Sequence, residues 1–533
     1  IAGSVRHGGS VVKVRVANCP SCGGPVEFHT KSSLVTICEF CQCIVARADK
    51  SVEDHGRVAD LALTVSPLFR GATGKIRGKN FEVTGRVQYQ HPAGGVWDEW
   101  YLLFSNGRWG WLAEAEGRYY LTFEEKVTSK VELPLFDTLE PGQRVTLGSR
   151  MQMTVAEVGT AEAKAAEGEI PWAFRTGAPH QFADLHGPDG KFGTIEYSDE
   201  QPRLFLGKEV TLDDLHVANE EWRSATGGGT SEARVEALSV NCPNCAGALT
   251  LHAPDDTLRV SCPSCASLLD CNNGKLEYLK TLKTRRIKPV IPLGQTGTLN
   301  GVDYTVIGFM DRFARYEGRD YPWTEYLLKR AKGGYRWLVR SYDSHWSFVE
   351  PISPSDVKES AQSLNALFKG QSFQLFDRGE ATVRHVLGEF YWKVEVGEKV
   401  RTADFIAPPQ MISMEFSGTE KSKEVNATLA MYKSPEEIES AFHVDDLVRP
   451  WGVSPVQPSP RVGDVIKLWL GFAGILLLLK MLFSQVLTDD SDTGFFRLCL
   501  VLASIFPIGV LIHKRSVEVS RWKNSDYNPY ADD

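Results

Sequence analysis

The sequence lacks the motifs of several large enzyme classes. It has no Gly-x-Ser-x-Gly nucleophile elbow, no His-Glu-x-x-His helix, no P-loop and no Gly-x-Gly-x-x-Gly dinucleotide turn. It also lacks a basic excess, because 59 Lys and Arg stand against 67 Asp and Glu, for a net charge of −8. A general nucleic-acid binder normally presents a basic face to the phosphates. We therefore predict no catalytic residues, and we do not expect nucleic acid as a partner.

Cysteine is scarce but strongly patterned. The chain has 11 cysteines, and eight of them form four Cys-x-x-Cys pairs in two matched quartets. Two thiolates at i and i+3 fit a tight knuckle that presents both sulfurs to one metal ion, and a second knuckle completes a tetrahedral site. We predict two zinc ribbons that hold two structural zinc ions through these ligands: Cys19, Cys22, Cys38, Cys41, Cys242, Cys245, Cys262 and Cys265.

Other uses of Cys-x-x-Cys fit this chain less well. A redox dithiol needs one such pair in a βαβ setting, and a disulfide framework belongs to short secreted chains. Four thiolates leave no open coordination position, so the predicted sites are structural and do not activate water. Cys43 is close enough in sequence to compete with Cys41, and His29 and His252 stand at equivalent places as candidate extra ligands. Reduced thiols indicate the cytosolic side of a membrane.

Long apolar runs are confined to the C-terminal part. Segments 464–487 and 495–512 are almost continuously apolar around a short acidic loop. About twenty apolar residues span a bilayer as a helix, and basic flanks favour the cytosolic side. We predict a transmembrane hairpin in the inner (cytoplasmic) membrane, with the soluble units and the tail in the cytosol. A buried helical hairpin is the alternative, and Ile1–Asn18 has no segment of signal-peptide type.

The chain is internally duplicated. Cys19 and Cys242 are separated by the same 223 residues that separate Gly71 and Gly294. The segment WDEWYLLF from Trp97 has a counterpart in WTEYLLKR, and the pairs GEIPW/GEFYW and GTIEYS/MISMEFS follow in the same order. A whole unit, ribbon included, is therefore present twice.

Each unit is predicted to be mainly β. Short runs rich in β-branched and aromatic residues alternate with turn signals such as Asn106-Gly107, which is typical of antiparallel hairpins. We expect tandem small antiparallel β modules after each ribbon, related or continuous, and helices only at 212–217, 355–368 and 434–442. The predicted organisation is an N-terminal extension (1–18), ribbon 1 (19–48), repeat unit 1 (66–217), a linker (218–240), ribbon 2 (241–272), repeat unit 2 (289–443), a linker (444–463), two transmembrane helices (464–487 and 495–512) and a cytosolic tail (513–533).

The glycine and aromatic motifs of the two units resemble a known family. The order of a ribbon, G-x-x-G-x-x-x-G and a hairpin with W-x-E-W/Y-x-L is similar to an uncharacterised bacterial family, domain of unknown function 4178. The resemblance covers Phe69 to Leu215 and Ile291 to Phe442. It implies accessory proteins encoded near spermidine-synthase-like enzymes and small membrane proteins, in settings of envelope stress. It implies no catalytic residues.

Clustered aromatic residues suggest a place for a ligand. The matching hairpins carry rings beside an acidic residue, which could hold a peptide, a base or a cation such as a polyamine. The alternative is that most of these rings fill a core. The candidate ligand-binding residues are Trp97, Glu99, Trp100, Trp323, Glu325 and Tyr326.

Three classes of function remain. The first is a membrane-anchored, non-enzymatic adaptor or scaffold whose duplicated units bind a cytosolic protein partner or a small cationic ligand. Two linked copies raise effective concentration even when each contact is weak. The second is a nucleic-acid sensor at the membrane, and the third is an enzyme subunit acting with a polyamine-synthase-like partner. Homo-oligomers would fit any of the three.

Overall fold

The computed structural model describes most of the chain outside the linkers and termini. His29, most of the predicted linker 218–240 and the segment 451–461 before the last two helices lie outside the described residues. The described ranges are 2–4, 13–28, 33–47, 52–62, 64, 66–115, 117–127, 133–148, 151–198, 201–217, 238–254, 256–272, 275–282, 287–330, 334–358, 364–419, 421–450, 462–482 and 490–522.

The first repeat forms one closed antiparallel ring of strands, the first barrel. Its hydrogen-bonded order is β8, β9, β10, β11, β16, β15, β14, β13 and back to β8. The expected small β modules are therefore continuous, because the long strand β13 takes part in both halves of the ring. The strands are β7 (Thr73–Ile76), β8 (Lys79–Gln90), β9 (Val96–Phe104), β10 (Trp109–Ala115), β11 (Arg118–Glu125), β12 (Arg144–Leu147), β13 (Met151–Ile170), β14 (Pro179–His186), β15 (Lys191–Glu196) and β16 (Arg203–Val210).

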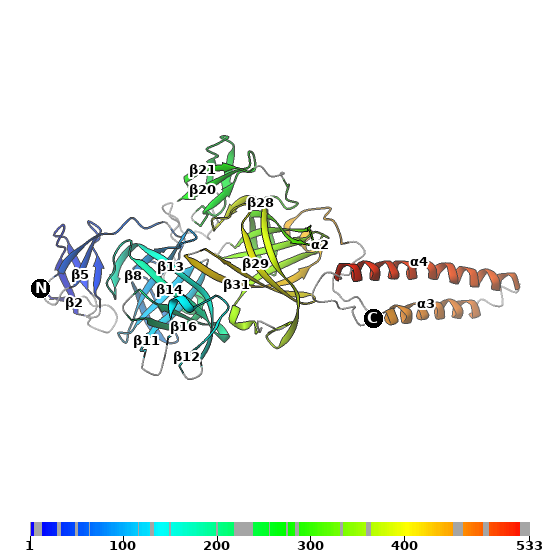
Figure 1. Ribbon diagram of the computed structural model, residues 1–533, viewed down its shortest axis with the longest axis horizontal. Helices are drawn as coiled ribbons and strands as arrows, with labels where there is room; N and C mark the ends of the chain where they lie inside the picture. The colour runs from blue at the N-terminus through cyan, green and yellow to red at the C-terminus, as the bar shows by residue number, and fades with distance from the viewer. Residues whose placement is uncertain are drawn as a thin grey trace.

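The second repeat forms a second barrel with the same strand order. Its ring is β23, β24, β25, β26, β31, β30, β29, β28 and back to β23. The two barrels lie next to each other along the length of the molecule (Figure 1). The strands are β22 (Thr296–Leu299), β23 (Val302–Tyr316), β24 (Arg319–Arg330), β25 (Tyr335–Ser341), β26 (Trp346–Ile352), β27 (Asn365–Phe368), β28 (Gln371–Phe390), β29 (Lys399–Ala407), β30 (Gln410–Gly418) and β31 (Ser422–Lys433).

Repeated glycines allow the strands to approach closely at one place in each barrel. Gly168 has φ 71°, and a Cβ there would lie 2.2 Å from the carbonyl oxygen of Thr84. Gly388 has φ 84°, and its Cβ would lie 2.3 Å from the carbonyl oxygen of Ile307. Only glycine combines a positive φ with such contact at little cost. The Gly-Glu pair shared by GEIPW and GEFYW thus has a structural explanation.

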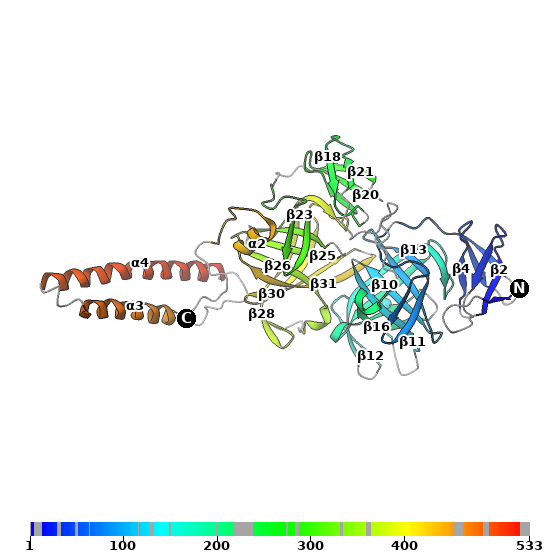
Figure 2. The ribbon, with the colours of Figure 1, turned by 180° about the vertical axis from the view of Figure 1, so that it is seen from behind.

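Each cysteine quartet belongs to a small β module that extends a barrel. The first cysteine module (13–57) adds β4 to β13, and the second cysteine module (238–281) adds β19 to β28. Figure 2 shows the two modules at separate places on the barrels. The strands are β2 (Lys13–Asn18), β3 (Pro25–Phe28), β4 (Val35–Ile37), β5 (Cys43–Arg47) and β6 (Val52–Arg57), then β17 (Leu238–Asn241), β18 (Ala248–Leu251), β19 (Arg259–Ser261), β20 (Ser267–Asn272) and β21 (Lys275–Thr281); β1 (Ala2–Ser4) pairs with β2.

A buried glutamate fastens each module to its barrel. Glu389 of β28 accepts hydrogen bonds from the backbone N–H groups of His252 (2.6 Å) and Ala253 (2.9 Å) and from the Thr257 hydroxyl (3.0 Å). At the equivalent place Glu169 of β13 accepts a hydrogen bond from the Ser33 hydroxyl. These carboxylates connect each module to a strand of the barrel that is distant in sequence.

The two barrels are joined by strand pairing. Residues 157–159 of β13 pair with residues 422–424 of β31. The Ser422 hydroxyl donates to Glu157 at 3.0 Å, and the imidazole of His91 lies 2.7 Å from the same carboxylate. The junction therefore combines main-chain pairing with a polar side-chain cluster.

The predicted helices are partly confirmed. Helix α1 (Leu212–Leu215) begins after a Thr211 capping box, and α2 (Pro435–Phe442) after a Ser434 capping box. The predicted helix at 355–368 is wrong. This segment contains a 3-10 turn at Pro354–Asp356 and strand β27, with 359–363 outside the described residues. Pairing of β27 with β28 overrides the helical pattern of the local sequence.

Two helices follow the barrels and lie side by side in both views. They are α3 (Val462–Leu482) and α4 (Asp490–Trp522), at the end of the molecule opposite the first cysteine module (Figures 1 and 2). Helix α4 extends beyond the predicted 495–512 at both ends. In the described part of the chain no helix is long and apolar enough to cross a membrane. The predicted transmembrane hairpin is therefore not supported.

Candidate metal centres and a carboxylate-lined cavity

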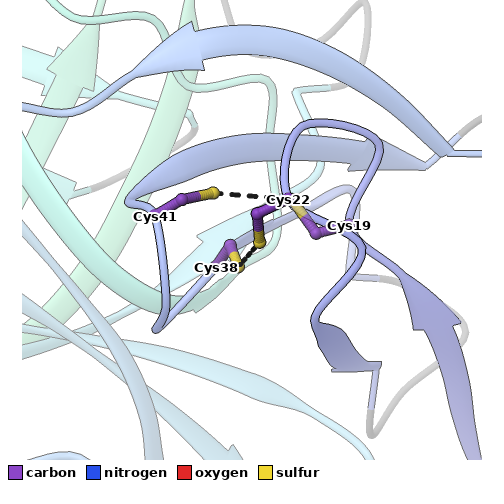
Figure 3. A group of neighbouring side chains, drawn as sticks. All are labelled: Cys19, Cys22, Cys38 and Cys41. Atoms are coloured by element: carbon purple, nitrogen blue, oxygen red, sulfur yellow. Dashed lines mark hydrogen bonds between the residues drawn. The ribbon is translucent and has the colours of Figure 1, made fainter.

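The first quartet of cysteines gathers at one point of the first cysteine module. The Sγ atoms of Cys19 and Cys41 are 3.7 Å apart, and those of Cys22 and Cys38 are 3.6 Å apart (Figure 3). A zinc ion with Zn–S bonds of about 2.3 Å requires tetrahedral sulfur separations of about 3.8 Å. All four sulfur atoms lie within 4.8 Å of one another, so the cluster can hold a metal ion.

The second quartet repeats this arrangement in the second cysteine module. Cys242 and Cys265 bring their Sγ atoms to 3.8 Å, and Cys245 and Cys262 to 3.9 Å. In each cluster two cysteines are buried, one is intermediate and one is exposed. The structure thus brings together all eight predicted ligands as two four-cysteine groups.

The backbone turns explain why this spacing gathers the sulfurs. In each Cys-x-x-Cys turn, the residue after the second cysteine donates its N–H to the carbonyl of the first, as Gly23 does to Cys19 (2.8 Å) and Ala246 to Cys242 (2.8 Å). That residue has positive φ in all four turns, at Gly23, Gln42, Ala246 and Ala266. The chain therefore turns sharply enough to place both sulfurs on one side.

Two of the three additional ligand candidates, Cys43 and His252, lie in the described part of the chain and outside both groups. Cys43 is buried, and its thiol points to the carbonyl of Ile44 at 3.7 Å. The serine two residues beyond Cys265 occupies the equivalent position in the second module. His252 contributes its backbone N–H to Glu389, and burial lowers the pKa of its imidazole. Neither side chain belongs to a four-cysteine group.

The second candidate site is a cavity of about 2280 Å³ lined by residues of both barrels. Four of the six predicted ligand-binding residues line it, namely Trp97, Glu99, Trp323 and Glu325. Trp97 of β9 packs against Phe182 of β14, and β8 and β13 lie between these two strands in the first ring. Side chains of such strands meet only across the inside of a closed ring, so this face of β9 points inward.

The other two predicted residues point away from the cavity. Trp100 and Tyr326 are each 1% exposed and belong to apolar cores. Trp100 donates its indole N–H to Glu114 at 2.9 Å, and the Tyr326 hydroxyl accepts the N–H of Val290 at 3.1 Å. Successive side chains of a strand point to opposite faces, so Trp100 cannot join Glu99. Their assignment to the ligand site is not supported by this geometry.

Buried carboxylates gather in the first barrel. Burial, together with the charges of Glu196 and Asp184, raises the pKa of Glu99 to about 8. Burial and the charge of Glu157 likewise raise the pKa of Asp184 to about 7. Asp184 accepts a hydrogen bond from the Thr194 hydroxyl at 2.7 Å. Buried carboxyl groups with raised pKa values favour binding of a cation, because a nearby cation would stabilise their ionised form.

The second barrel repeats these carboxylates at equivalent strand positions. Glu325, Asp404 and Glu415 correspond to Glu99, Asp184 and Glu196 in strand register. Burial, helped by the charge of Asp377, raises the pKa of Asp404 to about 7. The Asp404 carboxylate accepts a hydrogen bond from a serine, Ser413, as Asp184 does from a threonine.

One arginine distinguishes the second set. Nη1 of Arg312 lies 3.1 Å from Glu325 and 2.8 Å from Glu415, and Nη2 lies 3.4 Å from Glu415. Burial opposes its charge, but the two carboxylates outweigh burial and raise the pKa of Arg312 above its ordinary value. In the first barrel the equivalent residue is Tyr89, because both pair with the tryptophan of their hairpin.

Sequence reasoning found the hairpin half of this site and missed the rest. Asp184, Asp404 and Arg312 were not among the candidates. Glu196 and Glu415 stand in GTIEYS and MISMEFS, which were recognised only as repeat markers. The acidic position shared by those two segments is the signal from which this part of the site could have been predicted.

Comparisons with known proteins place the repeats in a family. A family model described as "Domain of unknown function (DUF4178)" matches residues 70–212 and 292–435, which together exceed half of the chain. No curated protein matches the chain.

Solved structures offer only weak likeness. One is the structure of intact Ap-TbpB with its N and C lobes, at 8% identity and a TM-score of 0.10, with 74% of this chain and 84% of that chain covered. Another is the Pseudomonas aeruginosa MucA/MucB complex, at 9% identity and a TM-score of 0.09, with 69% and 92% covered. Such scores carry no argument about fold or function. The family model matches more than half of the chain, and this chain belongs to the DUF4178 family with two copies of its domain.

Proposed function

We propose that the chain is a non-enzymatic binding protein whose paired barrels take up small organic cations. The observation that carries this proposal is the recurrence of acidic residues at equivalent positions facing the cavity, Glu99 and Asp184 in one barrel and Glu325 and Asp404 in the other. Tryptophan side chains stand beside them in both barrels. Carboxylates next to aromatic faces are a chemistry that recognises cations.

The two four-cysteine groups support a structural role for zinc within this proposal. The eight cysteines would hold one zinc ion in each module, and the sulfur separations of 3.6 to 3.9 Å fit tetrahedral coordination. A bound zinc ion would cross-link the two Cys-x-x-Cys turns of its module, and its four cysteine ligands would leave no coordination position open. Each module in turn adds a strand to its barrel, so the metal would stabilise the binding unit as a whole.

The partner and the location remain predictions from the sequence. A scaffold at the inner face of the cytoplasmic membrane would present both barrels to cytosolic molecules, and a protein could be recruited by the duplicated surfaces. Carbonate extraction of cell membranes, followed by detection of the chain in the pellet or the supernatant, tests the location independently of ligand binding.

Thermal unfolding of the purified full-length chain tests the proposed function. The ligands are methylguanidinium, methylammonium and tetramethylammonium, with the neutral molecule methylurea as control. At least one cation should raise the melting temperature in a concentration-dependent way, because a ligand that binds only the folded state stabilises it. If none of the three cations raises the melting temperature above that measured with methylurea, the proposed function is wrong.

A further inference from the structure

The second barrel already contains a cation in its carboxylate site. Arg312 is 6% exposed, and its guanidinium contacts Glu325 and Glu415 while it lies over the ring of Trp323 at 5.7 Å. The indole N–H of Trp323 also donates to Glu325 at 2.6 Å. The chain itself therefore shows which cation this arrangement accommodates: a planar guanidinium between two carboxylates and beside a tryptophan.

The first barrel repeats the hairpin tryptophan and glutamate, Trp97 and Glu99, without that guanidinium, whereas Glu196, the counterpart of Glu415, is paired with an arginine of its own. Tyr89 stands where Arg312 stands, and its ring stacks on Trp97 at 5.2 Å. Glu99 receives the Tyr101 hydroxyl at 3.3 Å. Among the residues that the structure describes, no Lys, Arg or His side chain lies within 4.0 Å of the carboxylates of Glu99 or Asp184.

Arg203 of the first barrel pairs with other carboxylates. Arg203 lies 3.5 Å from Glu196 and 3.0 Å from Glu124, and its guanidinium is placed over Trp172 at 5.8 Å. Glu196 does not line the cavity, whereas Glu99 and Asp184 do. The two cavity-facing carboxyl groups thus lack a cationic partner among the described side chains, while Glu196 is compensated by Arg203.

From this comparison we propose that the first barrel binds one alkylguanidinium cation at Glu99, against Trp97 and with Asp184 nearby, and that Arg312, which lies at Glu325 and over Trp323, is the built-in counterpart of this ligand in the second barrel. The inference rests on the proposed function and specifies the ligand class and the number of sites. It predicts one bound ligand per chain although the domain is present twice.

The remaining walls of the first site are compatible with a cation. Phe182 and His180 line the cavity next to Trp97 and stack on each other at 5.8 Å. Burial, together with the charge of Arg203, lowers the pKa of His180 to about 4. This imidazole is therefore neutral at neutral pH and offers an aromatic face without repelling the ligand.

Isothermal titration of the full-length, metal-loaded chain with methylguanidinium tests the inference. Wild type should bind one equivalent. Glu99→Gln should weaken binding at least about tenfold, because it removes a charged hydrogen-bond acceptor. Tyr89→Arg should abolish binding by supplying the resident cation of the second barrel. Glu162→Gln, a surface change on β13, is the matched control and should bind as wild type does.

The reciprocal experiment removes the guanidinium of Arg312 from the second barrel. Arg312→Gly leaves the space of the guanidinium between Glu325 and Glu415, so this variant should bind two equivalents of methylguanidinium and regain thermal stability when it is added. Circular dichroism and metal content show whether each variant is folded. If Tyr89→Arg does not fold, the inference is still tested by the isosteric variant Glu99→Gln and by the stabilisation of Arg312→Gly by methylguanidinium.

The outcomes separate the inference from the proposed function. Two equivalents on wild type, or unchanged binding by Glu99→Gln, overturns the inference. Binding of methylammonium at Glu99 without methylguanidinium also overturns it but leaves the cation-binding function standing. If no cation binds at all, both fail. One equivalent, lost with Glu99→Gln and doubled with Arg312→Gly, supports the inference.

Discussion

The two barrels of this chain share a strand order but differ in how the charges of their buried carboxylates are compensated. In the second barrel Arg312 lies between Glu325 and Glu415 and compensates both. In the first barrel Tyr89 takes its place, and Glu99 faces the cavity beside Asp184. Both barrels thus keep the strand order and the acidic positions, but the arginine beside them differs: Arg312 in the second barrel, and Arg203 at Glu196 in the first.

The cysteine modules provide a contrasting pair, because they differ little. Both gather four sulfurs with the same turns and the same burial pattern. Under the proposed function the similar modules maintain structure, and the barrel interiors, which differ, bind the ligand. The predictions below test both halves of this comparison.

The largest effect is expected from loss of a metal ligand. Cys38→Ser and Cys262→Ser should each lower the metal content from two ions per chain to one, because each removes a fully buried sulfur from a four-cysteine group. Structural zinc can contribute on the order of 10 kcal/mol to a small domain. Elemental analysis by mass spectrometry measures the content.

Cys43→Ser is the matched control for these variants. The equivalent residue of the second module is already a serine, Ser267, so the variant should keep both ions. Equal loss of metal in Cys43→Ser would show that Cys43 is a ligand and that the two modules differ after all.

Removing the internal cation should have the next largest effect. Arg312→Ala should lower the free energy of unfolding by about 3–5 kcal/mol, because it leaves two buried carboxylates without their partner. Tyr89→Phe at the equivalent position should cost about 1 kcal/mol or less. Hydrogen exchange of β23–β24 and of β8–β9 measures each barrel separately, and equal effects would remove the distinction drawn between them.

The fastening glutamates should give a smaller effect. Glu389→Gln should weaken three hydrogen bonds to the second cysteine module, at a cost of about 1–3 kcal/mol. We expect faster hydrogen exchange in β19 and β20, with the metal retained. Glu169→Gln tests the corresponding contact with Ser33 in the first module. Unchanged exchange in both variants would show that strand pairing alone holds the modules.

The smallest expected effect is a pH dependence of the first barrel. Burial raises the pKa of Glu99 to about 8 and of Asp184 to about 7, so the folded state keeps protons that the unfolded state releases near pH 4. The free energy of unfolding should therefore fall as the pH rises from about 5 to 8. Both side chains are partly exposed along the cavity, and solvent screening of partly exposed charges limits the size of the effect.

Glu99→Gln should flatten this dependence, as measured by denaturant unfolding at several pH values. Glu325→Gln is the comparison in the second barrel. It should lower stability across the same pH range, because it removes a partner of Arg312. If both variants flatten the slope equally, the arginine does not distinguish the two sites.

Local patterns in the sequence predicted the local parts of this structure. The metal ligands could be identified because i and i+3 spacing needs only a turn, and the capped helices α1 and α2 follow short signals. The duplication was visible in shared offsets. The helix predicted at 355–368 failed, because pairing with β28 decides the conformation of β27.

The cavity could be predicted only in part. Trp97 and Glu99 were found, but Trp100 was grouped with them although adjacent residues of a strand face opposite ways. Asp184 lies far from Glu99 in the sequence, and closure of the ring brings the two together. A contact between residues so far apart in sequence cannot be predicted from a local pattern. Arg312 was missed because we assumed that duplicated units have duplicated sites.

The fastening of the modules also bears on the order in which this chain assembles. The sulfurs of Cys19 and Cys41 are 22 residues apart, whereas the contact between Ser33 and Glu169 spans 136 residues. Contacts close in sequence form faster than distant ones, because less chain entropy is lost on closing the loop. During synthesis each four-cysteine group can therefore form before the barrel strand that its module contacts has left the ribosome, and the module can then act as a template for folding of the barrel.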